Sequence, residues 1–139
     1  MVATVPSSRQ ADLAYANAQG DVSNDLMQAI GNIADARESL GSGDTQTAKT
    51  DFQEAKGYFH SGLATLDRHH PTPKYAELDK EMRLTLINYI AGCDQLLGYL
   101  RNGGSQKVFN SFSSAFGAAT DHMARAEKII AKLKREKSP

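Results

Sequence analysis

Apolar side chains return at alternating intervals of three and four residues through the last third of the chain. The set consists of Phe109, Phe112, Phe116, Ala119, Met123, Ala126, Ile130 and Leu133. Spacing of this kind draws one apolar stripe along a helix and is typical of long helices that pack side by side. Gly103 and Gly104 precede the stripe and Ser105 is available as an N-cap, so we predict a helix over about residues 105–135.

The segment after residue 44 repeats this pattern. Its apolar or small positions are Ala48, Phe52, Ala55, Phe59, Gly62 and Leu66. Asp44 or Thr45 is a suitable N-cap, and Pro71 prevents the helix from continuing. We therefore predict a second helix over about residues 44–68.

A third segment carries the widest apolar surface. Its main face consists of Tyr75, Leu78, Met82, Leu86, Tyr89, Cys93, Leu96 and Leu100. Thr72 followed by Pro73 predicts an N-cap and a proline at the first helical position. We expect a helix over about residues 73–101 that is the most enclosed of the set.

The first segment is less regular. Leu26, Ile30, Ile33 and Leu40 share a helical face, whereas few large apolar residues precede Val22. We expect one long helix over about residues 8–40, or a short helix broken near Gly20 and followed by a longer one.

Together these segments predict an all-α fold in one domain spanning residues 1–139. The connections between helices are about three to five residues long, which favours antiparallel neighbours. The predicted architecture is an antiparallel up-down-up-down four-helix bundle. No segment alternates apolar and polar residues as a strand does.

Composition narrows the class of protein. The apolar run around Leu84 to Leu100 is interrupted by polar residues, so we expect no transmembrane segment. The first eight residues lack the basic and apolar regions of a secretory signal, which leads us to expect a cytoplasmic protein. Cys93 is the only cysteine, so no disulfide forms within the chain.

Charge is distributed unevenly although the formal net charge is zero. Residues 1–73 carry five Lys and Arg against nine Asp and Glu, and residues 74–139 carry eleven against seven. A basic stripe on the last helix, with the spacing of one helical face, consists of Arg125, Lys128, Lys132 and Arg135. Asp21, Asp25 and Asp35 share a face of the first helix, and we predict that the acidic and basic stripes flank a common seam.

Candidate chemistry is sparse. The four histidines, His60, His69, His70 and His122, include no pair spaced four residues apart, so we expect no metal site. Cys93 lies on an apolar face of its helix. A catalytic thiol needs a base within hydrogen-bonding distance, and the sequence does not indicate such a contact with Asp94 or with the Asp121–His122 pair. We therefore expect no catalytic residues and no cofactor.

The leading functional hypothesis is a non-enzymatic bundle that acts through protein–protein interaction or self-association. One alternative is a bundle that binds or senses a small ligand near aromatic residues such as Tyr58, Tyr89, Tyr99 and Phe116. Another is a protein that binds an anionic surface through the basic stripe, a peripheral membrane being favoured over nucleic acid because no aromatic side chain accompanies the stripe.

Overall fold

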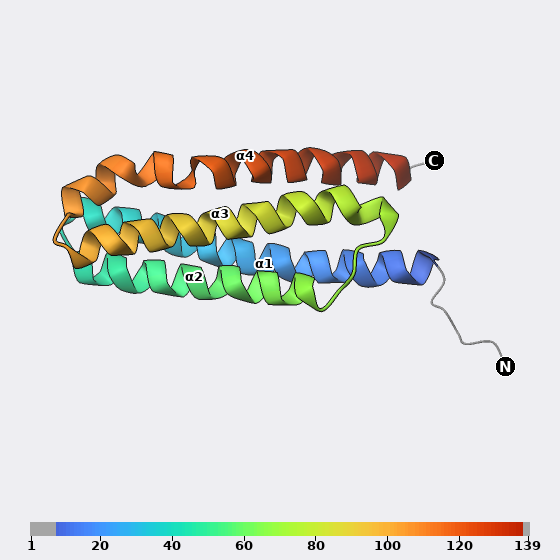
Figure 1. Cartoon of the computed structure of the whole chain (residues 1–139), viewed down its shortest axis with the longest axis horizontal. Helices are drawn as coiled ribbons and strands as arrows, with labels where there is room; N and C mark the ends of the chain where they lie inside the picture. The colour runs from blue at the N-terminus through green and yellow to red at the C-terminus, as the bar shows by residue number, and fades with distance from the viewer. Residues whose placement is uncertain (1–7, 138–139) are drawn as a thin grey trace.

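The computed structural model describes residues 8–137 and contains four long α-helices (Figure 1). Helix α1 comprises Ser8–Gly41, α2 comprises Thr45–Asp67, α3 comprises Ala76–Arg101 and α4 comprises Ser105–Lys137. A short 3-10 helix, η1, covers Pro73–Tyr75. No strand occurs within the described residues, which confirms the all-helical prediction.

The helices lie along one long axis, and their connections fall at alternating ends of the molecule (Figure 1). Helix α1 packs closely on α2, and α4 packs closely on α3. Helices α2 and α3 join these two pairs, whereas α1 and α4 approach each other much less. The contacts are those of a helical bundle in which one of the four sides is less tightly closed than the others.

Helix α1 runs through Gly20 without interruption, so the alternative of two shorter helices is wrong. Tertiary contacts explain this continuity, because Ala18 and Val22 on either side of Gly20 are buried against the rest of the bundle. Burial of both neighbours offsets the weak helix propensity of one glycine.

The α1–α2 and α3–α4 turns lie at the same end of the molecule (Figure 1), and each contains a glycine with a positive φ angle. Gly43 and Gly103 adopt φ angles of 82° and 73°, a left-handed conformation that glycine tolerates best. Asp44 caps α2, because its carboxylate accepts hydrogen bonds from the Thr47 amide at 3.0 Å and from the Thr47 hydroxyl at 2.6 Å.

The start of the third helix differs from the prediction. Residues 73–75 form a 3-10 turn before α3 begins at Ala76, and Thr72 makes no side-chain capping bond. The Thr72 hydroxyl instead donates to the Asp12 carboxylate of α1 at 2.5 Å. A contact to a distant helix thus replaces the local cap.

A cluster of aromatic rings from three helices lies within the core. Phe59 of α2 stacks on Tyr89 of α3 with ring centres 4.7 Å apart, and Tyr89 lies 5.5 Å from Phe116 of α4. Phe112 continues the cluster, since its ring centre lies 5.2 Å from Phe116 and 6.2 Å from Phe52. These contacts hold α2, α3 and α4 together at the middle of the bundle.

The buried face of α4 is rotated relative to the predicted stripe at its first turn. Phe109 keeps 45% of its surface exposed, whereas Val108, which the stripe omitted, is fully buried. Farther along, Phe116, Ala119 and Ala126 are buried, and the remaining members of the stripe are only half-buried. The predicted stripe therefore marks the side of α4 that faces the core, but the other helices bury only part of it.

Helices α3 and α4 approach most closely at Gly92. A Cβ atom at this position would lie 2.7 Å from the backbone oxygen of Ala115 and 2.8 Å from the Phe116 ring. Because a helix backbone cannot yield as a flexible side chain does, we expect Gly92→Ala to lower the free energy of unfolding by about 1–3 kcal/mol, measured by urea denaturation.

Gly98 in the same helix provides the control for this prediction. A Cβ atom there meets only the tip of the Arg101 side chain, at 3.9 Å. Gly98→Ala is expected to raise stability by about 0.5–1 kcal/mol through improved helix propensity. Effects of opposite sign for the two variants would support the close approach, whereas stabilisation by both would contradict it.

Candidate functional site

The loosely closed side of the bundle contains a groove between α1 and α4, formed by two adjoining pockets that share Ser23 and Ile130. We call this feature the α1–α4 groove. Its larger pocket has a volume of about 320 Å³ and is lined by Ala16, Gln19, Gly20, Ser23, Tyr75, Leu78, Ile130, Leu133 and Lys134. Its smaller pocket measures about 180 Å³ and is lined by Ser23, Leu26, Met27, Ile30, Met82, Met123, Ala126, Glu127 and Ile130.

Apolar side chains form most of the groove. Ile30, Met123, Ile130 and Leu133 pack against the core but stay only half-buried, because no further helix covers them. Met27 at the edge keeps 72% of its surface exposed. Met27, Met82 and Met123 give the groove a deformable lining, since thioether side chains adapt to ligands of different shape.

One buried polar group in the groove lacks a partner. Gln19 is only 7% exposed, and its Oε1 atom accepts no hydrogen bond within the described structure. The orientation of the amide follows from Tyr15, whose single hydroxyl proton is donated to Asp79 Oδ1 at 2.6 Å. Tyr15 must therefore accept from Gln19 Nε2 at 2.8 Å, which leaves Oε1 as the unpaired atom.

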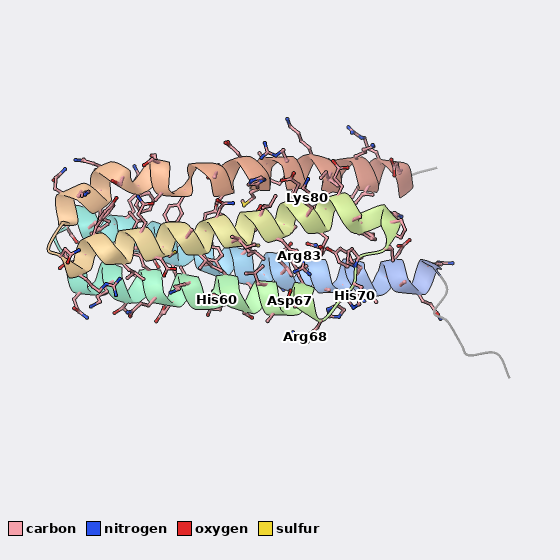
Figure 2. The ribbon with its side chains drawn as sticks, viewed as in Figure 1. His60, Asp67, Arg68, His70, Lys80 and Arg83 are labelled. Carbon is pink, nitrogen blue, oxygen red and sulfur yellow. The ribbon has the colours of Figure 1, made fainter. Side chains whose placement is uncertain are left out.

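This arrangement rests on a polar network beneath the groove. Asp79 also accepts from Arg83 Nε at 2.8 Å, and Arg83 donates to Asp67 at 2.6 Å and to the Leu66 carbonyl at 2.9 Å. Figure 2 shows Arg83 on α3 beside Asp67 at the end of α2. Burial, reinforced by the hydrogen bond to Asp79, raises the pKa of Tyr15 well above its usual range, so its hydroxyl remains a donor. Gln19 is held in place by this network.

A second polar cluster joins α3 to α4. Glu81 Oε2 lies 2.6 Å from His122 Nδ1 and 3.4 Å from Arg125 Nε. The hydrogen bond from His122 is the main cause that lowers the pKa of Glu81. A charged Glu81 can only accept a hydrogen bond, so Nδ1 of His122 carries the proton that is donated to it. Arg125 Nη2 lies 3.0 Å from the same nitrogen, and this contact therefore brings two donors together and is not a further hydrogen bond.

The lowered pKa of Glu81 predicts a pH dependence of stability. The folded state favours the charged form of Glu81. The stabilisation that this carboxylate provides is therefore fully present above its ordinary pKa of 4.5, and it is lost as the pH falls through the lower pKa of the folded state. We expect Glu81→Gln to flatten the loss of stability on acidification, measured as urea midpoints between about pH 7 and pH 3. Glu38→Gln, an exposed position on α1, should retain the slope of the unchanged protein, and an equal flattening in both variants would contradict the assignment.

The structure does not pair the acidic and basic stripes with each other. Arg125 pairs with Glu81 of α3, and Asp25 lines a hollow with residues of α2. Within the described residues no ion pair links α1 to α4. The two stripes therefore form no ion pair with each other, and their placement along a common seam stays a prediction. Binding of an anionic surface by Arg125, Lys128, Lys132 and Arg135 stays a prediction.

The remaining candidates for chemistry are dispersed. Burial raises the pKa of the Cys93 thiol to about 12, and Asp94 beside it pairs with Lys56 at 2.5 Å. His69 bonds to the Thr65 carbonyl at the end of α2, and Figure 2 places His60 in the middle of that helix and His70 in the connection after it. Within residues 8–137 no three potential metal ligands come together.

The aromatic residues suggested for a small ligand do not surround one cavity. Tyr89 and Phe116 belong to the packed core, Tyr58 faces a shallow hollow beside Asp25, and Tyr99 lies under Lys107 at 4.6 Å. The sequence did not predict the groove, because Gln19 and Ser23 in its lining occupy positions like those of any polar residues on a helix surface. Ile30 and Ile130 were recognised as core positions, but nothing in the sequence indicated that they remain only half-buried.

No helix in the described part of the chain combines the length and apolar character needed to cross a membrane. No protein-family model, curated protein or solved structure matches this chain.

Proposed function

We propose that this chain is a single-domain, antiparallel up-down-up-down bundle that acts by binding and not by catalysis, with the α1–α4 groove as its binding site. The ligand we infer is a small molecule with an apolar body and one N–H or O–H donor. The observation that carries this proposal is the unpaired Gln19 Oε1 atom in a groove whose lining is mainly apolar.

Both dimensions and chemistry support a ligand of this kind. The larger pocket, at about 320 Å³, has the size of small-molecule sites, which combine an apolar lining with few polar groups. A buried acceptor without a donor costs about 1–3 kcal/mol, so a ligand donor that pairs with it gains affinity. A carboxylate placed against Gln19 Oε1 would meet a second acceptor, so an N–H or O–H group suits that atom better.

Gly20 allows the groove to be filled with little disturbance of the fold. It lines the larger pocket, and a Cβ atom at this position meets nothing within 4 Å. We expect Gly20→Phe to place its ring in the groove and weaken binding of decan-1-ol by about tenfold or more in calorimetric titrations. Gly31→Phe is the matched control, since Gly31 also has open space but lies outside both pockets.

The proposal fails if decan-1-ol does not bind, or if Gly20→Phe binds it as tightly as Gly31→Phe does. Urea denaturation of both variants establishes that each is folded before the comparison. Because phenylalanine adds apolar volume to an apolar groove, the Gly20 variant is expected to be at least as stable as the Gly31 variant.

A protein partner, including a second copy of the chain, is the second candidate occupant. Leu13 and Met27 of α1 keep 51% and 72% of their surfaces exposed. They lie fourteen residues apart and hence on the same side of the helix, beside the groove. Light scattering should then show self-association that Met27→Lys abolishes. A monomer at high concentration that binds decan-1-ol would reject self-association and retain the ligand proposal.

A further inference from the structure

A cleft on the opposite side of the bundle gathers positive charge between α2 and α3. It has a volume of about 350 Å³ and is lined by Lys49, Gln53, Lys56, Asp94, Leu97 and Arg101. We call it the α2–α3 cleft. Its basic residues come from two helices and were not part of the basic stripe predicted on α4.

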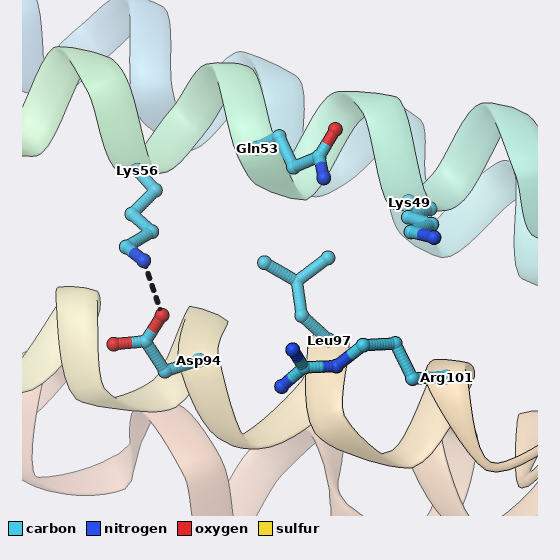
Figure 3. Close-up of a pocket in the computed structure, with 6 residues that line it drawn as sticks. All are labelled: Lys49, Gln53, Lys56, Asp94, Leu97 and Arg101. Carbon is cyan, nitrogen blue, oxygen red and sulfur yellow. Dashed lines mark ion pairs between the residues drawn. The ribbon is translucent and has the colours of Figure 1, made fainter.

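Only one of the three cations in the cleft is neutralised. Lys56 Nζ pairs with Asp94 Oδ1 at 2.5 Å, and Figure 3 shows this ion pair at one end. Lys49 lies toward the other end of the cleft on α2, with Gln53 between it and Lys56, and the Arg101 side chain extends along α3 to beside Leu97 (Figure 3). Neither Lys49 nor Arg101 has an acidic partner within the described residues.

Acidic residues cluster elsewhere on α2, which leaves this cleft positive. The pKa of Asp51 is raised by burial and by the nearby carboxylates of Asp35, Glu54 and Asp44. The acidic side chains therefore face the α1 side of α2, whereas Lys49 and Lys56 face α3. Two unpaired cations on facing helices repel each other, and an anion placed between them removes this repulsion.

We propose that the α2–α3 cleft binds a small phosphate-bearing anion. Arg101 supplies a planar guanidinium that can donate two hydrogen bonds to phosphate oxygens, and Lys49 supplies a compact positive charge. The Gln53 amide adds a neutral donor, and Leu97, which is buried, forms an apolar floor. This inference is independent of the α1–α4 groove, because the two features share no residue.

Pyrophosphate is the probe for this proposal, titrated into the full chain by calorimetry at constant ionic strength. We expect the double variant Lys49→Gln and Arg101→Gln to weaken binding at least about tenfold. The double variant Arg9→Gln and Lys80→Gln removes the same charge from exposed positions outside the cleft and outside the basic stripe of α4, and it is expected to bind as the unchanged protein does. Asp94→Asn frees Lys56 and is expected to strengthen binding.

Three outcomes would overturn the proposal. The first is the absence of measurable binding to the unchanged protein, and the second is equal weakening in both double variants, which would show a response to net charge alone. The third is unchanged affinity in the Lys49 and Arg101 variant. All three positions changed in the cleft variants are at least partly exposed, and denaturation midpoints confirm folding before each titration.

Discussion

Replacement of Arg83 by methionine is expected to lower the free energy of unfolding by about 2–4 kcal/mol in urea denaturation. Methionine retains an apolar stem but removes the donors to Asp67, Asp79 and the Leu66 carbonyl. Asp79, only 7% exposed, then keeps Tyr15 as its single side-chain donor. The cost lies below that of a fully buried pair because Arg83 is 32% exposed.

Arg68→Met is the matched control for this prediction. Arg68 is exposed, and its side-chain bond runs to the Thr65 hydroxyl at 3.3 Å, so its loss should change stability by no more than about 0.5 kcal/mol. Adding Asp79→Leu to Arg83→Met removes the stranded carboxylate and should recover part of the loss. Similar effects of the two arginine variants would show that the network does not stabilise the fold.

Phe59→Ala is expected to cost about 3–5 kcal/mol, whereas Phe109→Ala should cost less than about 1 kcal/mol. Phe59 is fully buried and stacks on Tyr89, so its removal leaves a cavity in the aromatic core. Phe109 belongs to the apolar stripe of its helix but keeps 45% of its surface exposed. Both free energies of unfolding are measured by urea denaturation, with the same dependence on urea concentration fitted for the two variants.

This comparison separates helical spacing from tertiary burial. Both phenylalanines occupy stripe positions, and spacing alone assigns them similar importance. An equal cost for the two substitutions would mean that Phe109 is covered in solution, either by a different placement of the first turn of α4 or by a second molecule. Val108→Ala provides a further check, since this fully buried residue lies off the predicted stripe.

The two candidate sites occupy different sides of the bundle and have opposite chemical character. The α1–α4 groove is mainly apolar and contains the buried, unpaired Gln19 Oε1 atom, and the α2–α3 cleft is polar with two unpaired cations. A molecule that binds one is poorly suited to the other. The decan-1-ol and pyrophosphate titrations consequently test two independent sites, and occupancy of one is not expected to depend on a variant at the other.

The four helices were predictable because the local signals agree with one another. Apolar spacing indicates where each helix runs, Gly43 and Gly103 adopt the left-handed turns that glycine favours, and Asp44 caps as its side chain allows. Pro71 and Pro73 mark the connection before α3. Thr72 is the exception, because its hydroxyl has a stronger alternative partner in Asp12.

The candidate sites were not predictable in the same way. Asp79 and Arg83 are spaced as an ordinary surface pair on one helix, yet the approach of α1 turns Asp79 into a buried partner of Tyr15. Lys49 and Arg101 are more than fifty residues apart and become neighbours of one cleft only when α2 and α3 pack. Likewise, Gln19 loses access to water only after the bundle forms.

The sequence by itself determined the all-helical class, the approximate limits of the last three helices and the side of each that turns toward the core, but it left the continuity of α1 open. Only the tertiary structure decided that α1 and α4 stay partly apart, that Gln19 Oε1 is left without a donor and that the charged stripes do not pair. The physical reason is that residue spacing defines the direction of a helical face, whereas the distance between helices depends on side chains from several segments packing at once.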